Sequence, residues 1–145
     1  MKNELELLNN FKLLTKKNFT FLSTTYDFIC TREEDKGTRY SEIVYENSKL
    51  KIKINFDAYS FEIGFYLSEA EANENLFSIG DLIGFYGVEK EIGFLAPQAN
   101  TPERIEIAVS AIAEFLKKYA TSLLKADKKE FQKIVAFRKK ITDGS

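Results

Sequence analysis

Residues 39–67 read RYSEIVYENSKLKIKINFDAYSFEIGFYL, and this stretch decides the fold. In 50–56 and again in 61–67, apolar residues alternate with polar residues, glycine or tyrosine. A period of two places each apolar set on one face of a sheet and each polar set on the other. Asn, Asp and Ser occur in the links between the runs, where their side chains bond nearby backbone and favour turns. The stretch therefore predicts three antiparallel strands, at about 39–46, 50–56 and 61–67, with one buried and one polar face.

The segment before these strands gives a helix signal and then an ambiguous one. Apolar residues in 3–15 recur mostly at spacings of three and four, which predicts an amphipathic helix. Residues 19–26 alternate like a strand, yet Leu14, Leu22 and Tyr26 continue a helical stripe, so both interpretations stay open. Residues 26–31 fit a first strand, and the polar residues 32–38, which include Gly37, fit a loop.

Helix signals dominate the chain after residue 67. A capping-box pattern at 68–71 predicts a helix start, residues 78–86 predict a short helix ending at Gly87, and 88–94 fit a short strand. Thr101 and Pro102 form a strong helix start, and the apolar stripe that follows predicts the longest helix, to about Lys125. A second capping box at 127–130 opens a final helix. We expect these of its residues to point inward: Phe131, Ile134, Val135 and Ile141.

These elements predict a single α+β domain over residues 1–145. It has an N-terminal helix, an antiparallel meander of three to five strands, and C-terminal helices packed on one face. The helix at 101–125 is the expected cover of the sheet. With 13 Phe, seven Tyr and no Trp, the chain predicts a phenylalanine-rich core.

Composition also bears on the compartment. No apolar run approaches the roughly 20 residues that span a bilayer, and the first residues lack the pattern of a secretion signal. Cys30 is the single cysteine, so an intrachain disulfide is excluded. We therefore expect a soluble, cytoplasmic protein that does not enter membranes.

The net charge of −1 hides a separation of charge. Residues 68–116 hold nine acids and two bases, whereas residues 117–140 hold nine bases and two acids. Such a separation can steer a charged partner, or the two regions can neutralise each other in the fold. Nucleic-acid binding through the basic tail is the less favoured interpretation, because the chain as a whole is slightly acidic and its lysines surround two helices.

The residue types present limit the possible chemistry. The chain has no histidine, which removes Ser-His-Asp and Cys-His arrangements and the usual zinc ligand. Cys30 is in phase with Phe28, and we expect it to be buried as a small hydrophobe. The acids at 33–35 lack the spacing of a calcium loop and fit a solvated loop, and Glu89 and Glu91, on one strand face, have no further support as an acid/base pair. We predict no catalytic residue, no metal site and no cofactor.

Three glycines, Gly80, Gly84 and Gly87, resemble a phosphate-binding loop only superficially. The Lys-Ser/Thr pair that a phosphate cradle needs is missing, and no clear parallel strand precedes them. Helix packing and a helix C-cap explain these glycines better.

The polar face of the predicted sheet remains as a candidate site. Tyrosines among mixed charges make a suitable protein-binding surface, although simple solubility explains the same residues. Lys51, Lys53 and Asn55 are expected to neighbour Glu62 and Tyr66 across the strands. The candidate protein-binding face comprises Tyr40, Glu42, Lys51, Lys53, Glu62 and Tyr66.

A longer pattern of apolar and turn residues runs through most of the chain. It consists of Phe19-x-Phe21-Leu22-x-x-x-Tyr26-x-Phe28, then Val44-Tyr45-Glu46-Asn47, Lys51-Ile52-Lys53-Ile54, and Leu116-x-x-Tyr119-x-x-x-Leu123-Leu124-x-x-Asp127-x-x-x-Phe131. This layout resembles small uncharacterised bacterial proteins, among them immunity-like proteins of polymorphic or contact-dependent toxin systems. The resemblance implies a non-enzymatic α+β protein that binds and blocks a partner, and it favours a helix at 19–26. It carries over no functional residue, because the pattern contains only packing positions.

The sequence thus favours a non-catalytic bacterial protein-binding domain with an immunity-like action. The alternative is a small-molecule-binding or carboxylate-based enzyme domain. That alternative requires a concave pocket with two or more acids of perturbed pKa.

Overall fold

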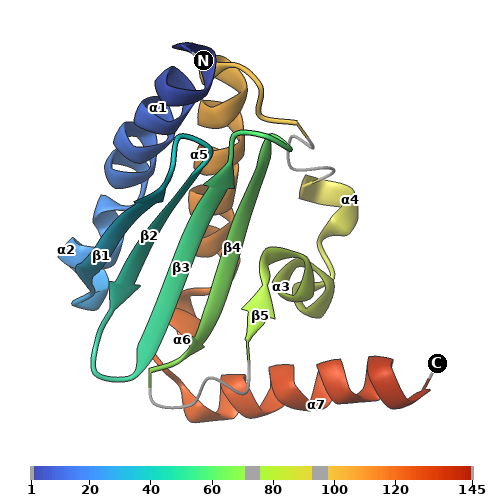
Figure 1. The fold of residues 1–145 in the computed structure, drawn as a ribbon. Helices are drawn as coiled ribbons and strands as arrows, with labels where there is room; N and C mark the ends of the chain where they lie inside the picture. Colours follow the sequence, from blue (N-terminus) through green and yellow to red (C-terminus); the bar gives the residue numbers. More distant parts are fainter. Residues whose placement is uncertain (1, 71–75, 93–97, 145) are drawn as a thin grey trace.

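A five-stranded antiparallel sheet forms the centre of the protein, in a computed structural model that describes residues 2–70, 76–92 and 98–144 (Figure 1). The strand order is β1-β2-β3-β4-β5, so each strand pairs with the next one along the chain. The strands are β1 (Ile29–Lys36), β2 (Tyr40–Glu46), β3 (Leu50–Asp57), β4 (Glu62–Glu69) and β5 (Phe77–Ser78). This meander, with helices before and after it, confirms the predicted α+β class.

The helices pack mainly on one face of this sheet. They are α1 (Lys2–Asn18), α2 (Thr20–Tyr26), α3 (Ile79–Tyr86), α4 (Glu89–Ile92), α5 (Pro102–Tyr119), α6 (Thr121–Leu124) and α7 (Lys128–Gly144). In Figure 1, α1 and α5 lie together behind the sheet, α3 lies beside β5, and α7 crosses one end of the sheet. Within the described ranges, no helix is both long and apolar enough to cross a bilayer.

The register of the central strands brings the apolar positions together. Ile54 of β3 lies between Ile43 of β2 and Phe65 of β4, and the other inward positions line up in the same way. Side chains at the turns hold this register. Asn47 Oδ1 accepts hydrogen bonds from the backbone N–H of Leu50 at 2.8 Å and of Lys49 at 2.9 Å, as expected for Asn in a hairpin link.

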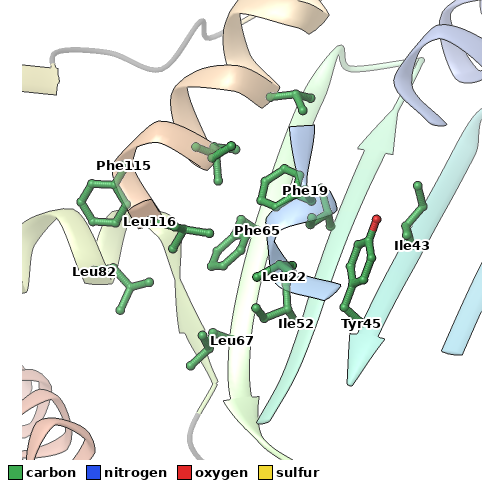
Figure 2. Packing of buried hydrophobic residues seen from close by; sticks show 14 of the residues in the cluster. Phe19, Leu22, Ile43, Tyr45, Ile52, Phe65, Leu67, Leu82, Phe115 and Leu116 are labelled. Atoms are coloured by element: carbon green, nitrogen blue, oxygen red, sulfur yellow. The ribbon is translucent and has the colours of Figure 1, made fainter. Parts of the chain in front are cut away.

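The core lies between this sheet face and the helices α1, α2 and α5 (Figure 2). Six phenylalanines from strands, helices and links are fully buried, which confirms the predicted phenylalanine-rich core: Phe11, Phe19, Phe28, Phe56, Phe65 and Phe77. Each contributes about 1.5–3 kcal/mol to stability through burial. The rings of Phe11 and Phe56 stack with centroids 5.5 Å apart and so join α1 to β3.

The prediction for the first strand was wrong in extent and in burial. β1 continues through residues 32–36, which read as a loop, and Cys30 is exposed rather than buried. The reason is that β1 is an edge strand with polar residues on both sides, so it shows no apolar alternation. Its acids bind α1 instead: Lys12 Nζ lies 2.8 Å from Asp35 Oδ2, and Lys16 Nζ lies 2.5 Å from Glu33 Oε2.

The helix interpretation of residues 19–26 and the helix prediction for 78–87 are confirmed, whereas the helix start predicted at 68–71 is not. Residues 20–26 form α2, which resolves the ambiguity in favour of a helix. α3 ends at Gly87 in a left-handed conformation, as predicted. It starts with a capping box that was not predicted, in which Ser78 and Asp81 exchange hydrogen bonds. Ser68 and Glu69 do not start a helix but extend β4 against β3, and the remainder of that predicted start, from residue 71, falls outside the described ranges.

The segment after α3 also differs from its prediction. Glu89–Ile92 form the helix α4 where a strand was expected, so Glu89 and Glu91 do not share a strand face. Phe94, at the end of the predicted strand, lies outside the part of the chain that the structure describes.

The C-terminal helices are divided differently from the prediction. Thr101 caps α5 and Pro102 occupies its first turn, as expected, but α5 ends at Tyr119 rather than near Lys125. α7 opens with Asp127 accepting a hydrogen bond from the backbone N–H of Lys129 at 2.9 Å. Ile141 is 57% exposed, contrary to the prediction, because the last turns of α7 project beyond the sheet (Figure 1).

We predict that Thr15→Val stabilises the protein by about 1 kcal/mol. Thr15 is fully buried in α1, and among the described residues its hydroxyl has no hydrogen-bond partner. Valine keeps the shape and removes the buried polar group. Urea unfolding measures the change, and Thr15→Ser, which keeps the hydroxyl and loses the methyl group, is expected to destabilise. A destabilised valine variant would show that the hydroxyl is bonded.

We predict that Ala126→Gly also stabilises the protein, by about 1 kcal/mol. Ala126 has φ 60° in the turn between α6 and α7, a left-handed conformation that strains a residue with a Cβ. Ala120→Gly is the matched control, because Ala120 has φ −104° and glycine there adds only chain entropy and a lost contact. The midpoint temperature of thermal unfolding should rise for Ala126→Gly and fall for Ala120→Gly. A lower midpoint in both variants would contradict the role of backbone strain at Ala126.

Candidate functional site

The sheet face opposite α1 and α5 is the candidate site, and we call it the open face. In Figure 1 none of the described helices crosses in front of it. Strand alternation places its side chains opposite the core positions of β2, β3 and β4. The open face comprises Arg32, Glu34, Tyr40, Glu42, Val44, Lys51, Lys53, Asn55, Glu62, Gly64, Tyr66 and Ser68.

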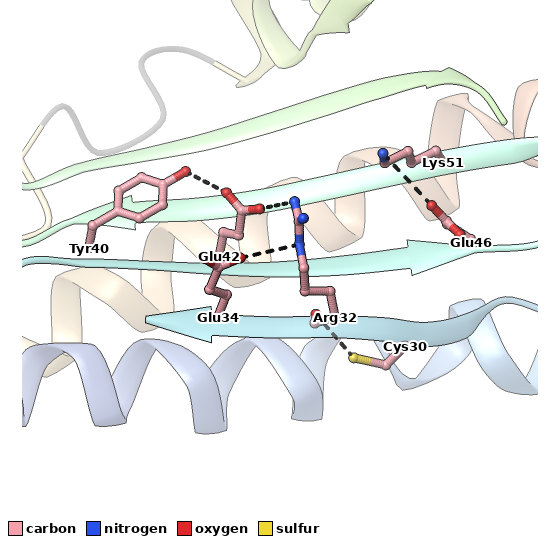
Figure 3. Close-up of polar contacts among 7 residues, drawn as sticks. All are labelled: Cys30, Arg32, Glu34, Tyr40, Glu42, Glu46 and Lys51. Atoms are coloured by element: carbon pink, nitrogen blue, oxygen red, sulfur yellow. Dashed lines mark hydrogen bonds and ion pairs between the residues drawn. The ribbon is translucent and has the colours of Figure 1, made fainter. Parts of the chain in front are cut away.

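A nearly buried carboxylate lies at the centre of the open face (Figure 3). Glu42 is only 4% exposed, and two neighbours satisfy its oxygens. Tyr40 donates its hydroxyl to Oε1 at 2.9 Å, and the guanidinium of Arg32 forms an ion pair with Oε2. Arg32 Nε also lies 3.6 Å from Glu34 Oε2. The carboxylate therefore fixes a tyrosine and an arginine in one orientation on β1 and β2.

The electrostatics of this cluster follow from its contacts. Burial opposes ionisation of Glu42, but the hydrogen bond from Tyr40 and the charge of Arg32 outweigh burial and lower the pKa of Glu42 below its ordinary value. Burial and the hydrogen bond to Glu42 raise the pKa of Tyr40 to about 12. At neutral pH the cluster thus consists of an ionised carboxylate, a neutral phenol and a cation. A carboxyl group held ionised in this way is unsuited to act as a general acid.

A second cluster lies on β3 and β4. Lys53 and Tyr66 are directly opposite each other, with Lys53 Nζ 5.6 Å from the centre of the Tyr66 ring. Gly64 makes this arrangement possible: a Cβ there would lie 2.5 Å from Asn55 Oδ1 and 2.9 Å from Tyr66 Cε2. The missing side chain lets Asn55 and Tyr66 lie close against the sheet.

A hollow of about 240 Å³ opens between the two clusters. Its lining contains three cationic side chains, one phenol and one hydroxyl. The residues are Arg32, Lys51, Lys53, Tyr66, Ser68 and Leu76. Arg32 is paired with Glu42, and Lys51 Nζ lies 3.8 Å from Glu46 Oε1, whereas Lys53 has no carboxylate within ion-pair distance among the described residues. Lys53 is therefore available to an incoming anionic group.

All six residues of the sequence-predicted face lie on the open face: Tyr40, Glu42, Lys51, Lys53, Glu62 and Tyr66. Glu62, however, does not lie beside Lys51 or Lys53. It lies opposite Asp57, four residues from Tyr66 along β4, or about 13 Å. The expected contact of Lys51 and Lys53 with Glu62 was wrong, since the register pairs Lys51 with Ser68.

Sequence reasoning missed Arg32 and Ser68. Arg32 read as part of a loop and Ser68 as a helix cap, so neither was placed on the sheet. The one signal in the sequence that could have pointed to Arg32 was Glu42. A carboxylate in the middle of a strand needs a cation or hydrogen-bond donors nearby.

Other candidate chemistry gains little from the structure. The described residues contain no group of three or more acids or cysteines that could hold a metal ion. The acids at 33–35 are engaged separately by Lys16, Arg32 and Lys12. Five hollows lined by described residues each contain at most one carboxylate, whereas a carboxylate-based enzyme needs two or more in one pocket.

We predict that Glu42→Gln lowers the free energy of unfolding by about 1–2 kcal/mol near pH 7. Because folding lowers the pKa of Glu42, its stabilising effect is present above the ordinary value of 4.5 and is lost as the pH falls through the lowered pKa. The difference between the two proteins should therefore shrink at about pH 3. Urea unfolding at both pH values measures it.

Glu62→Gln is the control for this prediction, because Glu62 is an exposed carboxylate on the same face. Its effect should stay within about 0.5 kcal/mol at either pH. A loss in Glu42→Gln that is equally large in acid would show that the hydrogen bonds of the amide, and not the lost charge, cause the destabilisation.

Comparison of the chain with protein-family models, with curated proteins and with solved structures found no match.

Proposed function

We propose that the chain is a non-catalytic bacterial protein-binding domain of the cytoplasm that holds a protein partner against its open face and blocks it, as immunity-like proteins do. One observation carries the proposal. On a sheet face that none of the described helices covers, the nearly buried Glu42 fixes Arg32 and Tyr40 in place. The resemblance in the layout of apolar residues supports the same function.

The residues on this face are of the types that contribute most to protein recognition. Tyrosine and arginine are enriched among the residues that dominate binding energy. Tyr40, Tyr66 and Arg32 provide them here, and each is already held by a neighbour. Side chains ordered before binding lose less conformational entropy when the partner arrives. A purely solvating face has no need of such ordering.

The hollow beside Tyr66 indicates what the partner presents. Three cations line it and no described carboxylate does, so an acidic side chain of the partner fits there. Lys53 is the expected contact, because it forms no ion pair within the described ranges: it lies over the ring of Tyr66, and the charge of Glu42 acts on it only from beyond ion-pair distance. Lys51 is expected to exchange its loose contact with Glu46 for the incoming carboxylate.

We predict that Lys53→Met and Tyr66→Ala each weaken partner binding by about tenfold or more. The partner is first captured on the immobilised protein from a lysate of the native organism and identified by mass spectrometry. Titration calorimetry with the purified partner then gives the dissociation constants. If the partner is a toxin, the same variants should lose protection in a growth assay.

Lys17→Met and Tyr59→Ala are the matched controls. Lys17 is exposed on α1, and Tyr59 is exposed in the turn between β3 and β4. Both should change affinity by less than about twofold. If the open-face variants bind as tightly as the controls, the partner uses another surface. Turnover of a substrate by the isolated protein would contradict the proposed class.

A further inference from the structure

A second surface, separate from the open face, lies along α7. A groove of about 710 Å³ runs between this helix and the ends of β3 and β4. The residues that α7 contributes are spaced by three and four, so they form one stripe of the helix. They are Lys128, Phe131, Gln132, Val135, Ala136 and Lys139. We call this surface the α7 groove.

The α7 groove has an apolar floor and a basic rim. Leu50 and Phe131 are almost completely buried, and Val135 is half-buried. Lys128 and Lys139 stand at the two ends of the stripe, and Lys49 adds a third cation from the turn between β2 and β3. Glu69 is the single carboxylate among the described lining residues.

Five lysines contribute to the positive charge of α7. Among the described residues, none of the five lysines of this helix forms an ion pair with a carboxylate. They are Lys128, Lys129, Lys133, Lys139 and Lys140. Within the described ranges, these lysines can therefore attract a partner of opposite charge.

We propose that the α7 groove binds an acidic amphipathic segment of a protein partner. Apolar side chains of the segment rest on Val135 and Ala136, and its carboxylates pair with Lys128 and Lys139. The two lysines are eleven residues apart on the helix, or about 16 Å, which is the length of roughly three helical turns of a bound segment.

The lining favours a polypeptide over a nucleic acid or a membrane. Bases bind by stacking on exposed rings, but the ring of Phe131 is buried in the floor. A bilayer meets a protein through a protruding apolar face, whereas here the apolar residues lie at the bottom of a concave surface with cations above them.

Fluorescence anisotropy with a labelled synthetic peptide tests the proposal on the full-length protein. The probe is a helix-forming peptide about three turns long, with leucine on one face and glutamate beside it. We expect saturable binding with a dissociation constant on the order of 10 µM at physiological salt. The same peptide with glutamine in place of glutamate should bind at least tenfold more weakly.

Two pairs of charge reversals distinguish the groove from the general charge of the helix. Lys128→Glu with Lys139→Glu changes the rim, and Lys133→Glu with Lys140→Glu changes net charge equally on lysines outside the lining. The first pair should weaken binding about tenfold or more, and the second less than about threefold. Ala136→Glu, at an exposed lining position, should act like the first pair. Circular dichroism checks that each variant is folded.

Four outcomes overturn the proposal. Equal losses from both lysine pairs would show diffuse charge attraction, and no saturation below about 1 mM would show no site. Binding of anionic vesicles or duplex DNA, in place of the peptide, would assign the groove to another class of partner. Sedimentation of the wild-type protein as a dimer that Lys128→Glu with Lys139→Glu dissociates would assign it to a second copy of the chain.

Discussion

The structure depends on the burial of one alternating sheet face against two helices. The inward residues of β2, β3 and β4 pack on α1 and α5, and the stacked rings of Phe11 and Phe56 join the first helix to the middle strand. Because side chains alternate along a strand, the same register that buries Ile43, Ile54 and Phe65 assigns every intervening residue to the other face. A slip of one residue would bury the lysines of β3 and expose its isoleucines. The composition of the open face is thus a consequence of core packing.

The polar side chains of the open face are held in place more firmly than solubility alone requires. Glu42 is removed from water on a polar face, and a carboxylate in that position is stable only with donors around it. Arg32 and Tyr40 supply them from the edge strand and from the same strand, so the cluster also ties β1 to the sheet. On the opposite side, α1 binds the acids of β1 through lysines. Charge pairs on both faces hold an edge strand that contributes few apolar contacts.

The two proposed binding surfaces both carry several cations, but they differ in the residues that lie between those cations. The hollow on the open face sets three cations around a phenol and a hydroxyl, which suits one carboxylate with a directional contact. The α7 groove is larger and has apolar residues between its cations, which suits a segment that carries both apolar and acidic side chains. Both sites favour acidic partners, although the chain itself carries a slight negative charge. Local arrangement, rather than net charge, decides which surface attracts an anion.

The sequence by itself determined the three central strands, the end of α3 at Gly87, the capped starts of α5 and α7, and six members of the open face. Each of these rests on a local signal, either a period of two or a capping residue. The tertiary structure alone decided the rest. β1 is a strand because α1 and β2 bind it, and Cys30 is exposed because its strand lies at the sheet edge. The predicted helix at 101–125 ends early, at Tyr119, although no glycine or proline stands there. Arg32 belongs to the candidate site because it pairs with Glu42. The α7 groove forms where α7 packs against the ends of β3 and β4, which are far from it in the sequence. Contacts between residues far apart in the chain leave no periodic trace, so only packing reveals them.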